Sequence, residues 1–374
     1  MDVSSLFLQF TKHDISFFTG VPDSQLKPLC NYLIRTYGIS NNHIIAANEG
    51  NAVALAAGYH LATGKVPCVY LQNSGIGNII NPVASLLSDK VYGIPCVFIV
   101  GWRGEPGLPD EPQHIFQGEV TLKLLEVMNI EYKIVDKDTT NSDLEYWMSG
   151  FMSLLDSGKN VALVVKKGGL YYDKKVVFKN DYCALGEDII QHIIQVAHED
   201  VIVSTTGKAS RELFETRENN GQSHKFDFLT VGSMGHSASI ALGVAIHEPN
   251  RRVWCIDGDG ASLMHMGSMA VIGAKSPSNF IHVIINNGAH DSVGGYPTVA
   301  ESINLNQIAL ACGYRGAYSA KNLTELDEVL RKINGKQGPT LIEVKSAIGS
   351  RENLGRPTNT PIENKTLFME YLKT

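Results

Sequence analysis

Short apolar runs alternate with helix-like segments along the whole chain, and this alternation restricts the fold more than any other feature of the sequence. The runs often end at glycine or at a polar residue. Continuous apolar strands separated by helices are typical of parallel sheets that helices cover on both faces. The sequence therefore predicts an α/β fold. The expected strands are residues 15–19, 66–71, 95–100, 161–165, 201–204, 252–256, 280–285 and 340–344.

The second half of the chain repeats the first at a constant spacing. Gly58 precedes an expected strand and Gly75 follows it, and Gly243 and Gly260 flank a later strand at the same separation. Both glycines of the second pair are therefore displaced from the first pair by the same length of chain. A chain of 374 residues also exceeds one ordinary domain. We therefore expect two doubly wound domains of one topology, with ligand sites at the carboxyl ends of their strands.

A basic segment separates the two halves. Residues 166–179 contain five lysines around a pair of glycines. An anion-binding patch is one interpretation of this segment, but an exposed linker between domains is the more ordinary one. We place the boundary at its end. This division gives an N-terminal domain of residues 1–179 and a C-terminal domain of residues 180–374 that includes a tail.

Composition argues against several classes of protein. The chain has 32 Lys and Arg against 38 Asp and Glu, a net charge of −6, which does not fit a broad nucleic-acid-binding surface. No apolar run approaches the roughly 20 residues that span a membrane. The first residues lack the pattern of a secretion signal, and the six cysteines include no CxxC pair. We therefore expect a reduced, cytoplasmic protein that binds neither nucleic acid nor membrane.

A glycine-rich turn follows the expected strand 252–256. Free backbone amides at such a turn attract phosphate, and glycine lets the phosphate oxygens approach the chain. Asp259 in this turn would repel phosphate unless a cation lies between them, and Mg²⁺ fits because it takes hard oxygen ligands. Asn287 comes directly after the next expected strand and is a candidate second ligand. The turn consists of Gly258, Asp259, Gly260, Ala261 and Ser262.

The pairing of this turn with Asn287 resembles the signature of thiamine-diphosphate-dependent enzymes. The resemblance implies that Asp259, the side chain of Asn287 and the backbone carbonyl of Ala289 bind Mg²⁺, while the amides of the turn hold the diphosphate. Gly232 and Met234 resemble the family's segment beneath the thiazolium ring, where a bulky apolar side chain keeps the cofactor bent. Without this resemblance, Met234 would be interpreted as an ordinary core methionine.

Glu49 follows a strand-like run, residues 44–47, in the first half. Its ordinary interpretation is an acid in the first turn of a helix. The resemblance instead implies that Glu49 hydrogen-bonds the aminopyrimidine ring of the cofactor and promotes loss of the proton at thiazolium C2. Gly75 is expected on a strand-end loop that faces the cofactor. The first domain is then the pyrimidine-binding domain and the second the diphosphate-binding domain.

The same resemblance has implications for assembly. In this family the glutamate of one chain faces the diphosphate-binding domain of another chain, so the active site lies at an interface. A homodimer is then the smallest active unit, and a larger oligomer would be unsurprising. Many family members carry a central domain between the two halves. The chain is too short for a central domain, which points to the compact decarboxylases.

Longer stretches narrow the resemblance to the family of phosphonopyruvate decarboxylases, with sulfopyruvate decarboxylases as the nearest alternative. The resemblance implies a carboxy-lyase that converts 3-phosphonopyruvate, an anionic 2-oxo acid, to 2-phosphonoacetaldehyde and CO₂ in phosphonate biosynthesis, such as that of 2-aminoethylphosphonate. A thiamine-diphosphate carboligase and a noncatalytic cofactor-binding subunit are less favoured alternatives. The stretches, within a resemblance that covers essentially the whole chain, are residues 19–28, 48–65, 70–75, 100–107, 110–114 and 288–295.

Proton donors are expected on strand-end loops of the first domain. Related decarboxylases carry an aspartate at the position that Asp23 occupies, and a histidine near the position of His114. The resemblance therefore implies that both belong to the catalytic site. Taken in isolation, the two residues would be interpreted as a surface carboxylate and a loop histidine.

A phosphonate dianion calls for guanidinium groups or backbone amides as ligands. Arg103, in a glycine-rich loop after an expected strand, is the leading candidate, and Ser24 is a second candidate substrate ligand. The ordinary interpretation of Arg103 is an exposed arginine stacked on Trp102. Arg351 and Arg356 in the C-terminal tail are weaker candidates, because a surface tail with ordinary charges explains either one alone.

Overall fold

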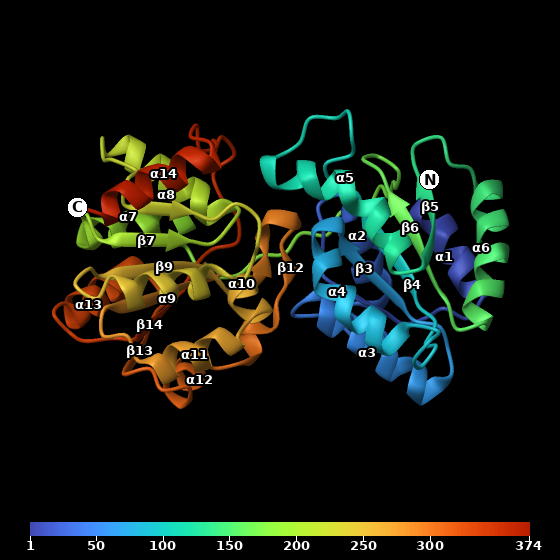
Figure 1. Cartoon of the computed structure of the whole chain (residues 1–374), viewed down its shortest axis with the longest axis horizontal. Helices are drawn as coiled ribbons and strands as arrows, with labels where there is room; N and C mark the ends of the chain where they lie inside the picture. The colour runs from blue at the N-terminus through green and yellow to red at the C-terminus, as the bar shows by residue number, and fades with distance from the viewer. The chain divides into compact units, whose positions relative to one another are not determined.

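The computed structural model describes all 374 residues, and the chain divides into two compact units, Met1–Val177 and Phe178–Thr374. The sequence places this division slightly later, after residue 179. Each unit contains one six-stranded sheet (Figure 1). None of the helices combines the length and apolar character that crossing a lipid bilayer requires.

The first unit holds its sheet between two layers of helices. Its strands are β1 (Phe18–Gly20), β2 (His43–Ile45), β3 (Cys68–Gln72), β4 (Val97–Gly101), β5 (Ile130–Val135) and β6 (Asn160–Val165), in the spatial order β2-β1-β3-β4-β6-β5. Its helices are α1 (Val3–Lys12), α2 (Lys27–Tyr37), α3 (Glu49–Thr63), α4 (Ile76–Pro82), α5 (Pro112–Val127) and α6 (Asn141–Asp156), with short turns η1 (Asn73–Gly75) and η2 (Val83–Leu87). Figure 1 shows α3 and α4 on one side of this sheet and α1 and α6 on the other.

The second unit repeats this design. Its main strands are β7 (Val201–Ser204), β8 (Asp227–Leu229), β9 (Val253–Gly258), β10 (Phe280–Asn286), β13 (Gly316–Ala320) and β14 (Thr340–Lys345), in the order β13-β14-β10-β9-β7-β8. Two short strands, β11 (Ala289–His290) and β12 (Tyr296–Pro297), form a separate antiparallel ribbon. The helices are α7 (Gly186–Ala197), α8 (Lys208–Asn219), α9 (Ser237–His247), α10 (Asp259–Met264), α11 (Gly267–Lys275), α12 (Leu305–Ala311), α13 (Leu323–Ile333) and α14 (Pro361–Leu372), with short turns η3 (Asp291–Val293) and η4 (Val299–Ser302).

Two apolar cores cover the faces of the second sheet. One core packs α7, α8 and α13 against the sheet, and the other packs α9, α11 and α12 against its opposite face. Successive residues of β9 alternate between the cores, because Trp254 and Ile256 belong to the first and Val253 and Cys255 to the second. Burial on both faces explains why the central strands are continuous apolar runs in the sequence.

Both sheets have the same topology. When the strands of each unit are numbered along the chain, they lie in the order 2-1-3-4-6-5 in both sheets, and every pair within them is parallel. The predicted pair of doubly wound domains of one topology, without a central domain, is confirmed. In such sheets ligands bind beyond the carboxyl ends of strands 1 and 3, where the strand order reverses. The loops after β1 and β3, and after β7 and β9, are therefore placed to carry binding sites.

Candidate active site

The turn that ends β9 places an acidic side chain in the interior of the second unit. Asp259 begins α10 directly after Gly258, and only 3% of its surface is exposed. Its carboxylate accepts a hydrogen bond from the Thr298 hydroxyl at 2.5 Å. Burial raises the pKa of Asp259 to about 6, although this hydrogen bond and nearby backbone amides oppose the rise. A bound cation would therefore stabilise the charged form of Asp259.

The end of β10 brings further oxygen atoms to the same edge of the sheet. The side-chain oxygen of Asn287 accepts a hydrogen bond from the backbone amide of Ala289 at 3.0 Å. Asn180 donates to the backbone carbonyl of Asn287 at 3.0 Å. Asp259, Asn287 and Ala289 all line one cavity. Carboxylate, amide and carbonyl oxygens are the ligands that Mg²⁺ takes, so these residues fit a site for a hard cation.

This cavity lies beyond the carboxyl ends of β7, β9 and β10 and brings together most of the residues predicted to hold the diphosphate end of a cofactor. Gly232 and Ser262 are not among its lining residues. The backbone amide of Gly232 donates to the Thr206 hydroxyl at 2.9 Å, and Ser262 is buried within α10. The predicted residues that line the cavity are Met234, Gly258, Asp259, Gly260, Ala261, Asn287 and Ala289.

Three residues around the start of α8 also line the cavity, and the sequence does not single them out. The hydroxyl of Thr205 is buried without a hydrogen-bond partner, which favours an acceptor on a bound ligand. Thr206 follows it, and Lys208 places its ammonium 2.8 Å from the carboxylate of Asp291. Free amides at a helix start, hydroxyls and a lysine suit an anion. The sequence gives one signal here: residues 204–207 (Ser-Thr-Thr-Gly) partly match residues 17–20 (Phe-Phe-Thr-Gly). This match indicates an equivalent strand end but not its chemistry.

Glu212 on α8 is another lining residue that the sequence does not single out. Its side chain is buried, and burial raises the pKa of Glu212 to about 7. The Lys208 charge opposes the rise, whereas Glu187 and Asp291 add to it. The charge inside this cavity therefore changes near neutral pH.

In the first unit, the start of α3 carries Glu49 into the interior, where 5% of its surface is exposed. The side-chain amide of Asn78 donates to Glu49 Oε2 at 2.7 Å. Gly75 leaves room for the carboxylate, because a Cβ atom there would lie 2.5 Å from Glu49 Oε1. Burial raises the pKa of Glu49, and the bond from Asn78 opposes the rise. The predicted pair Glu49 and Gly75 thus lies together, whereas Asn78 is not predicted from the sequence.

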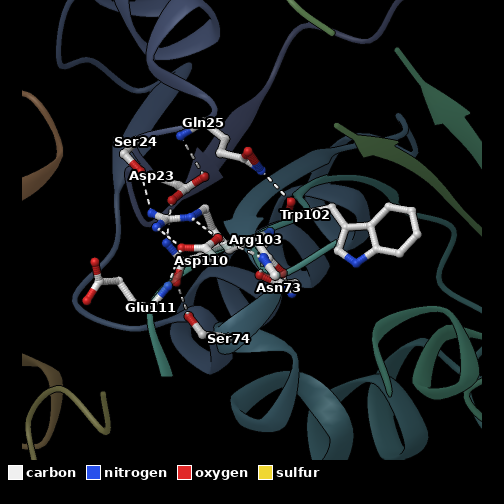
Figure 2. Close-up of polar contacts among 11 residues, drawn as sticks. Asp23, Ser24, Gln25, Asn73, Ser74, Trp102, Arg103, Asp110 and Glu111 are labelled. Carbon is white, nitrogen blue, oxygen red and sulfur yellow. Dashed lines mark hydrogen bonds and ion pairs between the residues drawn. The ribbon is translucent and has the colours of Figure 1, made fainter. Parts of the chain in front are cut away.

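Asp23 lies beyond β1 and is fully enclosed within the first unit. Gln72 donates to Asp23 Oδ1 at 2.5 Å. The backbone amide of Gln25 donates to Oδ2 at 3.0 Å (Figure 2). Burial raises the pKa of Asp23, while these hydrogen bonds and the nearby charge of Arg103 oppose the rise. A buried carboxyl with a raised pKa retains its proton to a higher pH than an exposed aspartate does.

Arg103 lies beyond β4 and is held by two neighbours. Its Nε and Nη2 atoms donate to the Asp110 carboxylate at 2.8 and 2.5 Å, and Nη1 donates to the Ser24 hydroxyl at 3.1 Å (Figure 2). These bonds use three of the five N–H donors of a guanidinium. The ring of Trp102 lies under Lys166 instead of Arg103. A cavity beside Arg103 is lined by residues that include Ser24, Trp102, Asp110 and Lys167.

His114 lies in the first turn of α5 and is 8% exposed. Its Nδ1 atom has no hydrogen-bond partner. Burial and the positive charge of Arg103 lower the pKa of His114 to about 4. The imidazole is therefore neutral at physiological pH, and it can accept a proton at one nitrogen while the other carries N–H.

The C-terminal tail is bound to the helices of its own unit. Arg351 pairs with Glu187 at 2.7 Å and also with Glu215, and Arg211 donates to the backbone carbonyl of Gly355 at 2.6 Å. The side chain of Arg356 is exposed. The guanidinium of Arg351 thus contacts α7 and α8, and carboxylates already accept hydrogen bonds from it.

The two units match the two cofactor-binding domains of one class of enzyme. The domain described as "Thiamine pyrophosphate enzyme, N-terminal TPP binding domain" matches residues 1–125, and "Thiamine pyrophosphate enzyme, C-terminal TPP binding domain" matches residues 205–344. Thiamine pyrophosphate is another name for thiamine diphosphate. The fold and the matched domains define a thiamine-diphosphate-dependent enzyme.

Similarity over nearly the full length narrows this class. The chain is 35% identical over 378 residues to phosphonopyruvate decarboxylase from Streptomyces viridochromogenes, covering 96% of this chain and 92% of the relative. It is 34% identical over 391 residues to phosphonopyruvate decarboxylase from Streptomyces hygroscopicus, covering 99% and 94%. It is 27% identical over 351 residues to sulfopyruvate decarboxylase from Methanosarcina acetivorans, covering 87% and 86%. The chain belongs to the phosphonopyruvate decarboxylase family of thiamine-diphosphate-dependent decarboxylases, as the resemblance in its sequence indicates.

Proposed function

We propose that this enzyme decarboxylates 3-phosphonopyruvate to 2-phosphonoacetaldehyde and CO₂. The observation that carries the proposal is the similarity over nearly the whole chain to two phosphonopyruvate decarboxylases, at 35% and 34% identity. Loss of CO₂ from a 2-oxo acid leaves an electron pair on the former keto carbon, and bound thiamine diphosphate supplies the electron sink for it. The protein's own share is to hold the cofactor, to move protons and to bind a multiply charged substrate.

We assign Mg²⁺ and the diphosphate to the cavity of the second unit. Asp259, the side chain of Asn287 and the carbonyl of Ala289 would hold the ion. The raised pKa of Asp259 supports this assignment, because a cation offsets the penalty that burial imposes on a carboxylate. The amides of residues 258–262, the hydroxyl of Thr205 and the ammonium of Lys208 would hold the phosphate oxygens. Residues 232–234 would lie beneath the thiazolium ring.

We assign the pyrimidine end of the cofactor to Glu49 in the first unit. Its carboxyl would share a proton with a ring nitrogen of the aminopyrimidine, and burial supports this role because it favours the protonated form. Glu49 and Asp259 would then serve opposite ends of one cofactor. In the family that the sequence resembles, these ends come from different chains, so we infer a homodimer or a larger oligomer with the active site at the interface.

We assign the substrate to the strand-end loops of the first unit. Arg103 has two N–H donors beyond those that Asp110 and Ser24 accept, and they suit two oxygens of a phosphonate. Asp23 is the candidate proton donor, because burial keeps it protonated to a higher pH. His114 would serve as a neutral imidazole.

Two arginines of the C-terminal tail remain weaker candidates for the substrate site. Arg351 already pairs with Glu187 and Glu215, and the side chain of Arg356 is exposed. A phosphonate would have to compete with both carboxylates for the Arg351 guanidinium.

Phosphorus NMR tests the reaction directly. The protein is incubated with 3-phosphonopyruvate, thiamine diphosphate and Mg²⁺, and the expected product is 2-phosphonoacetaldehyde with one CO₂ released for each molecule. Sulfopyruvate decarboxylation is the second candidate, which the Methanosarcina relative supports. Turnover of sulfopyruvate but not of phosphonopyruvate would establish that alternative. A ligated product without free aldehyde would indicate a carboligase, and cofactor binding without turnover of any acid would indicate a noncatalytic subunit.

A further inference from the structure

Two elements beyond β3 enclose the carboxylate of Glu49. Gly75 of η1 makes room for the end of the Glu49 side chain, since a Cβ atom at this position would lie 2.5 Å from its Cγ, Cδ and Oε1 atoms. Asn78 in the first turn of α4 donates from its side-chain nitrogen to Oε2 at 2.7 Å. Glu49 itself begins α3, beyond β2. The two oxygens of the carboxyl group therefore have different surroundings, one facing a glycine and the other an amide donor.

We propose that Asn78 is a positioning residue that directs the proton of Glu49 to one oxygen. The proposal rests on the assignment of Glu49 to the aminopyrimidine of the cofactor. The nitrogen of an amide side chain only donates hydrogen bonds, so Glu49 Oε2 must accept in this contact. A neutral carboxyl group accepts best at its carbonyl oxygen, so the contact with Asn78 favours the proton of Glu49 on Oε1, the oxygen that lies against Gly75. This oxygen is the one left to donate to a ring nitrogen.

A neutral partner has a further consequence for the charge of Glu49. Burial raises the pKa of Glu49, and the two groups that oppose the rise, the amide of Asn78 and the backbone amide of Glu49 itself, are both uncharged. A lysine or arginine in place of Asn78 would keep the carboxylate ionised. The amide of Asn78 orients the carboxyl group and lowers its pKa. The effect of burial is larger, so the pKa remains above its ordinary value.

The test follows the titration of Glu49 in the cofactor-free protein. Carbon-13 NMR of labelled glutamate carboxyl groups gives the titration, and E49Q identifies the signal of Glu49. In N78A the pKa of Glu49 should rise, because a donor to the charged form is removed, and in N78D it should rise further, because a second carboxylate lies beside it. N81A is the matched control, since Asn81 is an exposed asparagine on the same helix. Asn78 is also exposed, so neither substitution removes core packing.

The second readout is hydrogen–deuterium exchange at C2 of bound thiamine diphosphate. N78A should slow this exchange by up to about tenfold, the effect of losing one ordinary hydrogen bond, and N81A should leave it unchanged. An unchanged titration of Glu49 in both N78A and N78D would overturn the proposal. Loss of exchange in E49Q with wild-type exchange in N78A would also overturn it and leave the role of Glu49 intact. Unchanged exchange in E49Q would instead remove Glu49 from the pyrimidine site.

Discussion

Burial raises the pKa of both Glu49 and Asp259, yet the neighbours of these two side chains differ in kind. Glu49 accepts a hydrogen bond from the neutral amide of Asn78 and lies against Gly75. Asp259 shares its cavity with the oxygen atoms of Asn287, and backbone amides, including that of Gly260 in its own turn, oppose the rise in its pKa. The first environment favours a carboxyl group that holds a proton, and the second favours a carboxylate that binds a cation.

Replacement of Glu49 by glutamine tests its proposed role. Glutamine keeps the shape of the side chain but holds no titratable proton. We expect E49Q to bind the cofactor almost normally while decarboxylation slows by about 10²- to 10⁴-fold, the usual contribution of a positioned acid or base. Calorimetric titration with thiamine diphosphate and steady-state kinetics measure the two effects. Near-normal turnover would remove Glu49 from the reaction.

Replacement of Asp259 by alanine should weaken retention of both Mg²⁺ and thiamine diphosphate. The pH dependence of metal binding gives a second check. The pKa of Asp259 without metal is about 6, so at pH 5 the ion must displace a proton that is absent at pH 7.5. We expect the Mg²⁺ affinity of the wild-type protein to fall roughly tenfold over this interval. Unchanged affinity in D259A would contradict the assignment.

Removal of the Arg103 guanidinium should discriminate between substrates. We expect R103A to lose more activity with phosphonopyruvate than with pyruvate, because pyruvate lacks the phosphonate that the guanidinium would bind. R103K is the matched control, since it keeps the charge but not the planar donor geometry that Asp110 and Ser24 contact. The kcat/KM values of both acids measure the effect. Equal losses for the two acids would show that Arg103 does not recognise the phosphonate.

At the level of the element, the sequence predicts the interior strands better than the edge strands. The eight expected strands correspond to the four central strands of each sheet. The four others, β2, β5, β8 and β13, are the edges of the two sheets, although the strand-like run 44–47 overlaps β2. Edge strands are partly exposed, so β5 and β13 carry polar residues that interrupt the apolar run. The position of an edge strand depends on its pairing with a neighbouring strand, and a local sequence pattern carries no information about that pairing.

The candidate site follows the same rule: residues in local motifs could be predicted from the sequence, and residues placed by packing could not. Asp259 and Asn287 stand in short local motifs directly after buried strands, so their sequence spacing already indicates a shared edge. Thr205 also follows a buried strand, but its segment has no motif that indicates its chemistry, and Asn78 reaches Glu49 only because α4 packs beside the start of α3. Interactions that depend on packing between elements therefore cannot be predicted from a local sequence pattern.

The contact between α5 and the loop that carries Arg103 gives a prediction at this scale. A Cβ atom at Gly118 of α5 would lie 1.7 Å from the backbone oxygen of Gly104. We expect G118A to lower the free energy of unfolding by about 1–3 kcal/mol, because the loop must move away from the helix. G150A is the control, since Gly150 of α6 has open space and alanine there should stabilise by up to about 1 kcal/mol. Urea denaturation measures both, and equal stability of the two variants would contradict this packing argument.

At the scale of the whole molecule, two copies of one sheet topology carry different chemistry at equivalent edges. The end of β3 supplies a glutamine, and the loops beyond β1 and β3 supply an enclosed aspartate and the glycine beside Glu49. The segments beyond β7 and β9 supply the hydroxyls of Thr205 and Thr206 and the glycine-rich turn of Asp259. The sheet edge of the first unit therefore suits proton transfer, and that of the second unit suits a phosphate group with a metal ion. Neither unit alone contains both sets of groups.

The most direct measurement is a parallel decarboxylation assay of phosphonopyruvate, sulfopyruvate and pyruvate with thiamine diphosphate and Mg²⁺, with E49Q as the inactive control. We expect the wild-type kcat/KM for phosphonopyruvate to exceed that for either other acid at least about tenfold, because a site that hydrogen-bonds the full phosphonate group disfavours acids that lack it. A kcat/KM for sulfopyruvate or pyruvate that equals or exceeds the value for phosphonopyruvate would contradict the proposed function.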